Sequence, residues 1–272
     1  MTASWRSAVA DLERAASAGG RRGLGKFVLE GVRLHERATR AGLAIETAVC
    51  TAAFRDDRSP RVEALLAALE AGGCRLYVVG DDIVARLTGG RGLGAIIGLA
   101  PIPEAPALAD ALARSPLAPP AVLIAAGIEE PGNVGALART ALASGAAALV
   151  AAAPSDPWHP KAVRTSMGAA FRLPILAAQP DVHAAIVLAR DAGLTVVAAI
   201  SRGGVPLELS RLGAAPAAIL IGGEAHGLSD AVLAACDLRV TIPMPVALDS
   251  LSVNAAAAVL LWEFRRLGFV SR

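Results

Sequence analysis

The run Ala121–Gly127, AVLIAAG, decides the fold class, because it is uncharged, apolar throughout and closed by a glycine. Similar, largely apolar runs follow it, with helix-like segments between them: ALVAAA at 148–153, RLPIL at 172–176, TVVAAI at 195–200, AAILIGG at 217–223 and LRVTIPM at 238–244. Strands that are apolar on both faces and joined by helices are typical of a parallel sheet covered on both sides. The sequence therefore predicts a doubly wound α/β domain over residues 121–272.

The chain before this domain has a different pattern. Pro and Ala dominate residues 101–120, a stiff composition that suits a domain boundary. We therefore expect an N-terminal domain at 1–103 and a linker at 104–120. Within the N-terminal domain the periodicity predicts helices over 5–18, 32–40 and 61–71, a short helix capped by Asp81-Asp82, and strands over 26–31, 45–50, 74–79 and 94–100. This order indicates a small αβα layered domain.

Composition narrows the class of protein. Of the 272 residues, 54% are hydrophobic and 18% are charged, so the chain can form substantial cores. The N-terminus lacks the apolar centre of a signal peptide, and no apolar stretch is long enough to span a membrane. Cys50, Cys74 and Cys236 are widely spaced and form no CxxC pair, so buried thiols are expected rather than a disulfide or a metal site. We expect a soluble, cytoplasmic protein.

Three short segments of the larger domain carry the chemistry. They are NVGALAR at 133–139, IGGEAHGL at 221–228, and IPM at 242–244 followed by DSLSVN at 249–254. A nicotinamide-binding domain would instead need a GxGxxG turn after its first strand. The first strand here ends in GIEEPGN at 127–133, which does not supply that turn. Together and in this order, the three segments resemble the signature motifs of the TrmH/SpoU branch of the SPOUT superfamily, which are RNA ribose 2′-O-methyltransferases.

The resemblance implies a fold, a cofactor and an assembly. It implies an α/β domain whose last strands and final helix form a trefoil knot, with S-adenosylmethionine bound by the knot loops and a homodimer formed through the final helix. The segment FVLEGVRL at 27–34 resembles the L30e-like substrate-binding domain that precedes the catalytic domain in many SpoU-type enzymes. By position, the cofactor contacts fall on Gly222, Gly223, Ile242, Met244 and Leu251. Glycines suit such loops because a missing side chain lets the backbone approach a ligand.

The resemblance also implies the catalytic residues Asn133, Arg139, Glu224 and Ser250. Family members are described with the arginine as base, but a guanidinium with a pKa above about 12 is a poor base at neutral pH. Binding a phosphate and polarising the 2′-hydroxyl is physically easier, and the sequence leaves the two roles open. The third motif departs from the family's Ser-Leu-Asn-Val-Ser, because Ser252 and Asn254 are exchanged. Two helical residues are about 200° apart, so Asn254 cannot simply replace the missing amide, and altered activity is possible.

The expected partner is RNA. Residues 1–40 hold eight basic side chains against four acidic ones, a surplus that suits either phosphate contacts or a solvated helix face. Arg21, Arg22 and Lys26 are the candidate contacts. Family members with the L30e-like domain mostly modify ribosomal RNA, so rRNA is favoured over tRNA. A non-catalytic RNA-binding or ribosome-assembly protein that keeps the fold is the alternative from another class.

Overall fold

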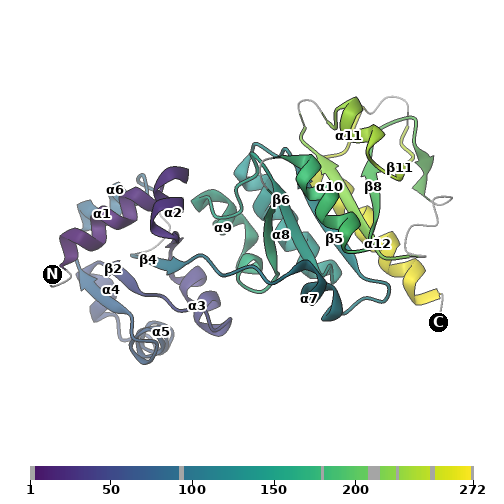
Figure 1. The fold of residues 1–272 in the computed structure, drawn as a ribbon. Coiled ribbons are helices and arrows are strands. Elements are labelled where there is room, and N and C mark those ends of the chain that lie inside the picture. Colours follow the sequence, from purple (N-terminus) through teal and green to yellow (C-terminus); the bar gives the residue numbers. More distant parts are fainter. Residues whose placement is uncertain are drawn as a thin grey trace. The chain divides into compact units, whose positions relative to one another are not determined.

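In the computed structural model the chain divides into two compact units (Figure 1). The described residues are 4–91, 95–178, 181–207, 215–224, 227–245 and 249–270. The first unit comprises Met1–Glu104 together with Trp158–Phe171, and the second comprises Ala105–Pro157 and Arg172–Arg272. The first unit is therefore built from two separate stretches of sequence, a feature that the sequence pattern does not indicate.

A mixed four-stranded sheet forms the centre of the first unit, in the order β1-β4-β2-β3. β4 pairs antiparallel with both β1 and β2, whereas β2 and β3 are parallel. The strands are β1 (Lys26–Glu30), β2 (Thr47–Cys50), β3 (Arg75–Val78) and β4 (Ile96–Pro101). The helices are α1 (Trp5–Ala15), α2 (Ala18–Leu24), α3 (Val32–Arg40), α4 (Ala52–Asp56), α5 (Pro60–Ala71), α6 (Asp81–Leu87), α9 (Pro160–Ser166) and the 3₁₀ turn η1 (Ala169–Phe171).

Helices cover both faces of this sheet. Successive strand residues point to opposite faces, so Phe27 and Leu29 enter one core, with α3 and α5, while Val28 enters the other, with α1 and α6. The expected αβα layering is confirmed. The L30e-like assignment stays a prediction.

The segment Trp158–Phe171 completes one of these cores. The rings of Trp158 and Phe171 lie 4.8 and 5.9 Å from the ring of Phe27, measured between centroids. Val163 of α9 is fully buried in the same cluster. Three apolar side chains far along the chain thus pack around one residue of β1.

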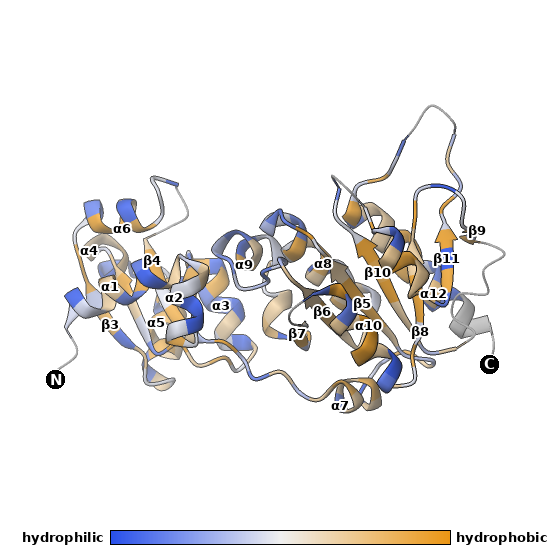
Figure 2. Ribbon diagram, turned by 45° about the horizontal axis from the view of Figure 1, so that its top comes forward, coloured by the Kyte–Doolittle hydropathy of each residue, from blue (hydrophilic) through white to orange (hydrophobic). Residues whose placement is uncertain are grey.

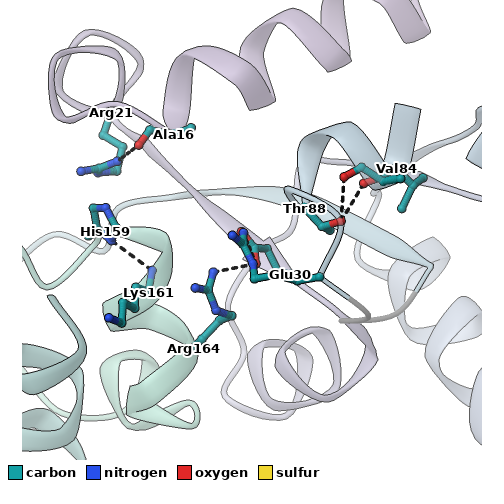
Figure 3. A network of polar contacts seen from close by, with 10 residues as sticks. Ala16, Arg21, Glu30, Val84, Thr88, His159, Lys161 and Arg164 are labelled. Atoms are coloured by element: carbon teal, nitrogen blue, oxygen red, sulfur yellow. Dashed lines mark hydrogen bonds and ion pairs between the residues drawn. The ribbon is translucent and has the colours of Figure 1, made fainter. Parts of the chain in front are cut away.

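A buried carboxylate adds a polar contact to this packing. The side chain of Glu30 is only 4% exposed, and its oxygen accepts a 2.7 Å hydrogen bond from Nη1 of Arg164 (Figure 3). Arg91 donates to the same carboxylate at 3.3 Å. Two guanidinium groups therefore share one buried carboxylate, and the cluster keeps a net positive charge.

The second unit is built on a seven-stranded sheet whose pairs are all parallel, in the order β7-β6-β5-β10-β8-β11-β9. The predicted doubly wound α/β fold is confirmed. The strands are β5 (Ala121–Ala126), β6 (Ala148–Ala152), β7 (Ile175–Ala178), β8 (Thr195–Ala199), β9 (Val205–Pro206), β10 (Ala217–Gly222) and β11 (Leu238–Thr241). The helices are α7 (Leu108–Ala113), α8 (Pro131–Ser144), α10 (Val182–Asp191), α11 (Asp230–Ala234) and α12 (Val253–Val270).

The central strands are apolar on both faces, as their colour in Figure 2 shows. α7, α10 and α11 pack on one face, and α8 and α12 pack together against the other. α7 lies inside the expected linker at 104–120, yet its Leu108 and Ala111 are buried in the second unit. At least over α7, this stretch is therefore part of the packed second unit.

The strand order brings four carboxyl ends to one edge. β10 inserts between β5 and β8, with Gly222 beside Ala126, and Ile221 beside Ala199. Val240 of β11 pairs with Ala199 in turn. The chain order reverses between β5 and β10, and ligands of open α/β sheets bind outside the carboxyl ends at such a point. The trefoil knot stays a prediction.

Candidate active site

A cavity of about 490 Å³ lies at the carboxyl ends of β8, β10 and β11, a volume typical of small-molecule sites. It is bounded on one side by residues 249–251 and by the first turns of α12. All five residues predicted to contact a cofactor line it: Gly222, Gly223, Ile242, Met244 and Leu251. Glu224 and Ser250, predicted to be catalytic, line it as well. The second and third motifs therefore form one site.

The glycine turn after β10 is tightly closed. The amide of Gly227 donates to the carbonyl of Gly223 at 2.9 Å, and Gly227 has a φ of 62°, which favours glycine. A Cβ on Gly222 would stand 2.7 Å from the carbonyl carbon of Gly227, and one on Gly223 would stand 2.8 Å from the carbonyl oxygen of Gly127. These glycines are needed first for backbone packing of the turn, which in turn shapes the cavity. Ala225 and His226 of the motif lie outside the described residues.

A second cavity of about 370 Å³ lies beside the first, at the end of β5 and the start of α8. Asn133 of the first motif lines it, together with Glu129 and Glu130. Gly223 and Glu224 line both cavities. The glycine turn is therefore a shared wall between the cofactor-type cavity and a smaller one that carries the first-motif asparagine.

Asn133 and Arg139 share a helix whose start is well defined. α8 begins at Pro131, and the side chain of Glu130 accepts a 2.8 Å hydrogen bond from the amide of Gly132, a typical N-terminal cap. Arg139 is exposed on α8 and lines neither cavity. Within the described chain its guanidinium makes no hydrogen bond or ion pair, and in particular none with Glu224. The structure thus brings every predicted residue of the larger domain to the cavities except Arg139.

The exchanged residues of the third motif have separate roles. Ser252 Oγ accepts from the amide of Ala255 at 3.3 Å and so caps α12. Asn254 Oδ1 accepts a 2.7 Å hydrogen bond from the hydroxyl of Thr140, on α8. The exchange therefore leaves a capped helix and adds a polar bond between α8 and α12.

Several cavity residues escaped the sequence prediction. Ala199, Ile200 and Ser201 follow β8 along the cavity, and Ala256 and Leu260 face it from α12. The signal for the first three was present, since the apolar run at 195–200 also ends in small polar residues and glycines. The contribution of α12 depends on how the helix packs, which the sequence does not reveal.

The candidate RNA contacts of the first unit differ from one another. Arg21 is only 3% exposed, and its guanidinium donates to the carbonyls of Ala15 and Ala16 at 2.9 and 2.8 Å, as Figure 3 shows in part. It stabilises the end of α1 and is no longer a candidate phosphate contact. Arg22 is exposed. Lys26 lies 2.6 Å from the carboxylate of Glu46, which offsets its charge.

The thiols are poor candidates for chemistry. Burial raises the pKa of Cys50 and of Cys74 to about 11, and raises that of Cys236 above its ordinary value. Thiols with such pKa values are weak nucleophiles at neutral pH.

Among the described residues no cluster of His, Cys, Asp and Glu could hold a metal ion. In the same part of the chain, no helix is long and apolar enough to cross a membrane.

An all-parallel sheet with two adjoining cavities at its carboxyl edge defines the class: an α/β protein that binds ligands at the ends of its strands. The sequence model of the SpoU rRNA methylase family matches residues 120–262. The chain belongs to this family.

Two proteins of similar sequence are also named as RNA methyltransferases. A protein of Mycobacterium tuberculosis H37Rv, named an uncharacterized tRNA/rRNA methyltransferase, is 32% identical over 80% of this chain and 74% of its own length. A Mycobacterium leprae protein of the same description is 38% identical over 58% of this chain, and the match spans about half (51%) of that protein.

Solved structures share the fold along nearly the whole chain. The S-adenosylmethionine-bound rRNA methyltransferase of Sinorhizobium meliloti superimposes with a TM-score of 0.81 at 26% identity, covering 98% of this chain and 97% of that one. A structure described as an RNA 2′-O ribose methyltransferase gives a TM-score of 0.74 at 32% identity, covering 95% of both chains.

Proposed function

We propose that the protein transfers a methyl group from S-adenosylmethionine to a ribose 2′-hydroxyl of RNA, with ribosomal RNA as the favoured substrate. The observation that carries the proposal is the larger cavity, on which five expected cofactor residues and two expected catalytic residues converge. The family match supports methyl transfer. The 2′-O ribose methyltransferase structure supports the acceptor atom, and the rRNA methyltransferase of S. meliloti supports the choice of RNA.

The larger cavity fits the cofactor. Ile221, Leu228, Ile242 and Leu260 give it apolar walls for a flat ring, while the glycine turn exposes backbone edges for polar contacts. Asp249 is fully exposed at the rim, where its carboxylate lies 3.6 Å from the guanidinium of Arg202. The amino group or sulfonium of the cofactor would compete with Arg202 for this carboxylate. The bound cofactor supplies an electrophilic methyl group, and the chain supplies its orientation.

The catalytic residues have separable roles. Asn133, in the smaller cavity, can hold a ribose hydroxyl or base edge by hydrogen bonds from its amide. Arg139, exposed on the same helix, binds the phosphate next to the target and polarises the 2′-hydroxyl. Glu224 lines both cavities, and its carboxylate is suited to accept a hydrogen bond or a proton. Ser250 offers a hydroxyl at the cavity edge. Holding the reactants in line can supply much of the rate.

RNA binding is assigned to the first unit. Arg22 is exposed, and Lys26 adds charge next to β1 although Glu46 partly neutralises it. The pair Arg91 and Arg164 shares the single buried carboxylate of Glu30, and Arg91 is 47% exposed. Such surplus positive charge attracts the RNA backbone.

We infer that the protein acts as a homodimer through α12. Val259 and Trp262 of this helix are 39% and 64% exposed, and large aromatic side chains are enriched at protein interfaces. The adjoining Leu260 and Leu261 are buried against the sheet. The helix thus has one face for its own core and one for a second copy.

The test is incubation with methyl-labelled S-adenosylmethionine and separate pools of rRNA and tRNA that lack the modification. Label on a ribose of rRNA is the expected result, and nuclease digestion to 2′-O-methylated nucleosides identifies the atom. Label in tRNA alone would establish the alternative substrate. RNA binding without label in either pool would establish the non-catalytic alternative, to which the exchange of Ser252 and Asn254 points.

A further inference from the structure

One hydrogen bond joins the two helices that carry the ends of the candidate site. The hydroxyl of Thr140 on α8 donates to Oδ1 of Asn254 on α12 at 2.7 Å, and both residues are partly buried. This distance is at the short, favourable end for an O–H···O bond. α12 lines the larger cavity through Val253 and Ala256, on either side of Asn254.

The bond lies next to Arg139, the predicted catalytic residue that lines neither cavity. Thr140 directly follows Arg139, and successive helical residues point about 100° apart. Fixing Thr140 against α12 therefore fixes the side of α8 from which the Arg139 side chain starts. The other α8 side chains in this region are apolar: Leu137, Ala138 and Ala141 are buried. These close-packed side chains hold α8 against the sheet and α12, and the hydrogen bond adds a directional contact beside Arg139.

The exchange in the third motif makes this bond possible. Ser252 already caps α12 through its hydroxyl, so position 254 is free for another role. The asparagine oxygen is one bond farther from Cβ than a serine oxygen would be. A serine at 254, as in the family pattern, would leave Thr140 without the same reach.

We propose that Asn254 is a positioning residue, which acts through Thr140 to fix the rotation of α8 and so the side of the helix on which Arg139 meets the RNA backbone. The inference rests on the proposed methyl transfer. In this interpretation, the exchange of Ser252 and Asn254 keeps the cap of α12 and adds a hydrogen bond that holds α8 against α12. It also distinguishes this chain from a protein that has lost its activity.

The test compares variants that remove or keep the bond. Thr140→Val removes the hydroxyl at nearly constant shape, and Asn254→Ala removes the acceptor. Thr140→Ser and Asn254→Asp keep a donor and an acceptor. Methyl transfer is measured at saturating RNA and cofactor, and calorimetry gives the cofactor Kd. Thr88→Val is the matched control, because it removes a buried threonine hydroxyl bond to the Val84 carbonyl in the first unit, and Thr88 lines neither cavity.

The expected result is a fall in kcat of about tenfold for Thr140→Val and for Asn254→Ala, which corresponds to one lost hydrogen bond. The cofactor Kd stays within about threefold, as expected when no ligand contact is removed. Thr140→Ser restores most of kcat. The double variant is no slower than either single one, because both remove the same interaction. Thr88→Val keeps the wild-type kcat.

Three outcomes would overturn the positioning role while leaving methyl transfer intact: an unchanged kcat in both variants, losses that multiply in the double variant, or a failure of Thr140→Ser to restore kcat. Parallel loss of cofactor binding and thermal stability would assign the bond to folding alone. A wild-type protein that labels no RNA would instead remove the proposed function, and the positioning role with it.

Discussion

Acid should destabilise the first unit through one buried histidine. His35 of α3 is fully buried, and its Nδ1 donates to the carbonyl of Gly31 at 2.8 Å. Within the described part of the chain its Nε2 has no hydrogen-bond partner. The pKa of His35 is lowered from 6.5 to about 4 by burial, against a smaller opposing effect of the bond to Gly31.

The sign and size follow from proton linkage. The unfolded chain binds a proton at His35 near pH 6.5, whereas the folded chain binds it only near pH 4. The neutral histidine therefore contributes full stability above about pH 6.5, and this contribution is lost as the pH falls toward 4. A difference of about 2.5 pKa units corresponds to about 3 kcal/mol of unfolding free energy.

Urea unfolding between pH 4 and pH 8 measures this loss. A Trp262→Phe background leaves Trp5 and Trp158, both in the first unit, as the fluorescent reporters. His35→Asn is the comparison, because the asparagine amide can keep a donor near the place of Nδ1 while the titrating ring is removed. The wild type should lose about 3 kcal/mol more than His35→Asn across this range.

The two proteins share all other carboxylates and histidines, so ordinary acid effects cancel in the comparison. Equal dependence on pH in both would show that the imidazole does not resist protonation, and that the unpaired Nε2 is satisfied in solution.

Four further predictions concern function. Arg139→Ala should lower kcat by more than tenfold, over about 1.4 kcal/mol of barrier, while calorimetry finds the cofactor Kd within a few-fold of wild type. Gly222→Ala should weaken cofactor binding at least tenfold, because its Cβ would stand 2.7 Å from the Gly227 backbone and overpacking costs about 1–3 kcal/mol; a wild-type Kd would show that the turn adapts. Trp262→Glu should give a monomer in analytical ultracentrifugation, and an unchanged dimer would move the interface off α12. Arg22→Ala should make the plot of log RNA affinity against log salt shallower by about 0.7, with kcat at saturating RNA unchanged; the reverse pattern would contradict the division of labour between the units.

Much of the architecture could be predicted because it depends on local patterns. The helix expected over 32–40 matches α3. Strands β5, β6, β8 and β10 fall within the predicted apolar runs. The spacing of apolar residues indicates helices and strands, and glycines often mark where these elements end.

Other features depend on contacts between distant segments. Arg21 has the composition of an RNA contact, yet it is buried against the end of α1. The partner of Asn254 is 114 residues away, so no motif spacing could reveal it. The resemblance to known motifs predicted several of the residues that line the cavities. It did not predict that Gly222 packs against the backbone of Gly227, because that contact depends on the three-dimensional turn.

The discontinuous first unit has a consequence for how the protein is made. Its core is unfinished when residue 104 leaves the ribosome, because Val163 and the ring of Trp158, which packs 4.8 Å from the ring of Phe27, are still to be synthesised. Domains generally fold as units during synthesis, the N-terminal one first. Here β5, α8 and β6 of the second unit must emerge before Phe171 can complete the first. We therefore expect the nascent N-terminal sheet to keep part of one apolar face uncovered until this segment is made. For the same reason, a fragment cut at the end of β4 would lack the part of this core that Trp158, Val163 and Phe171 supply.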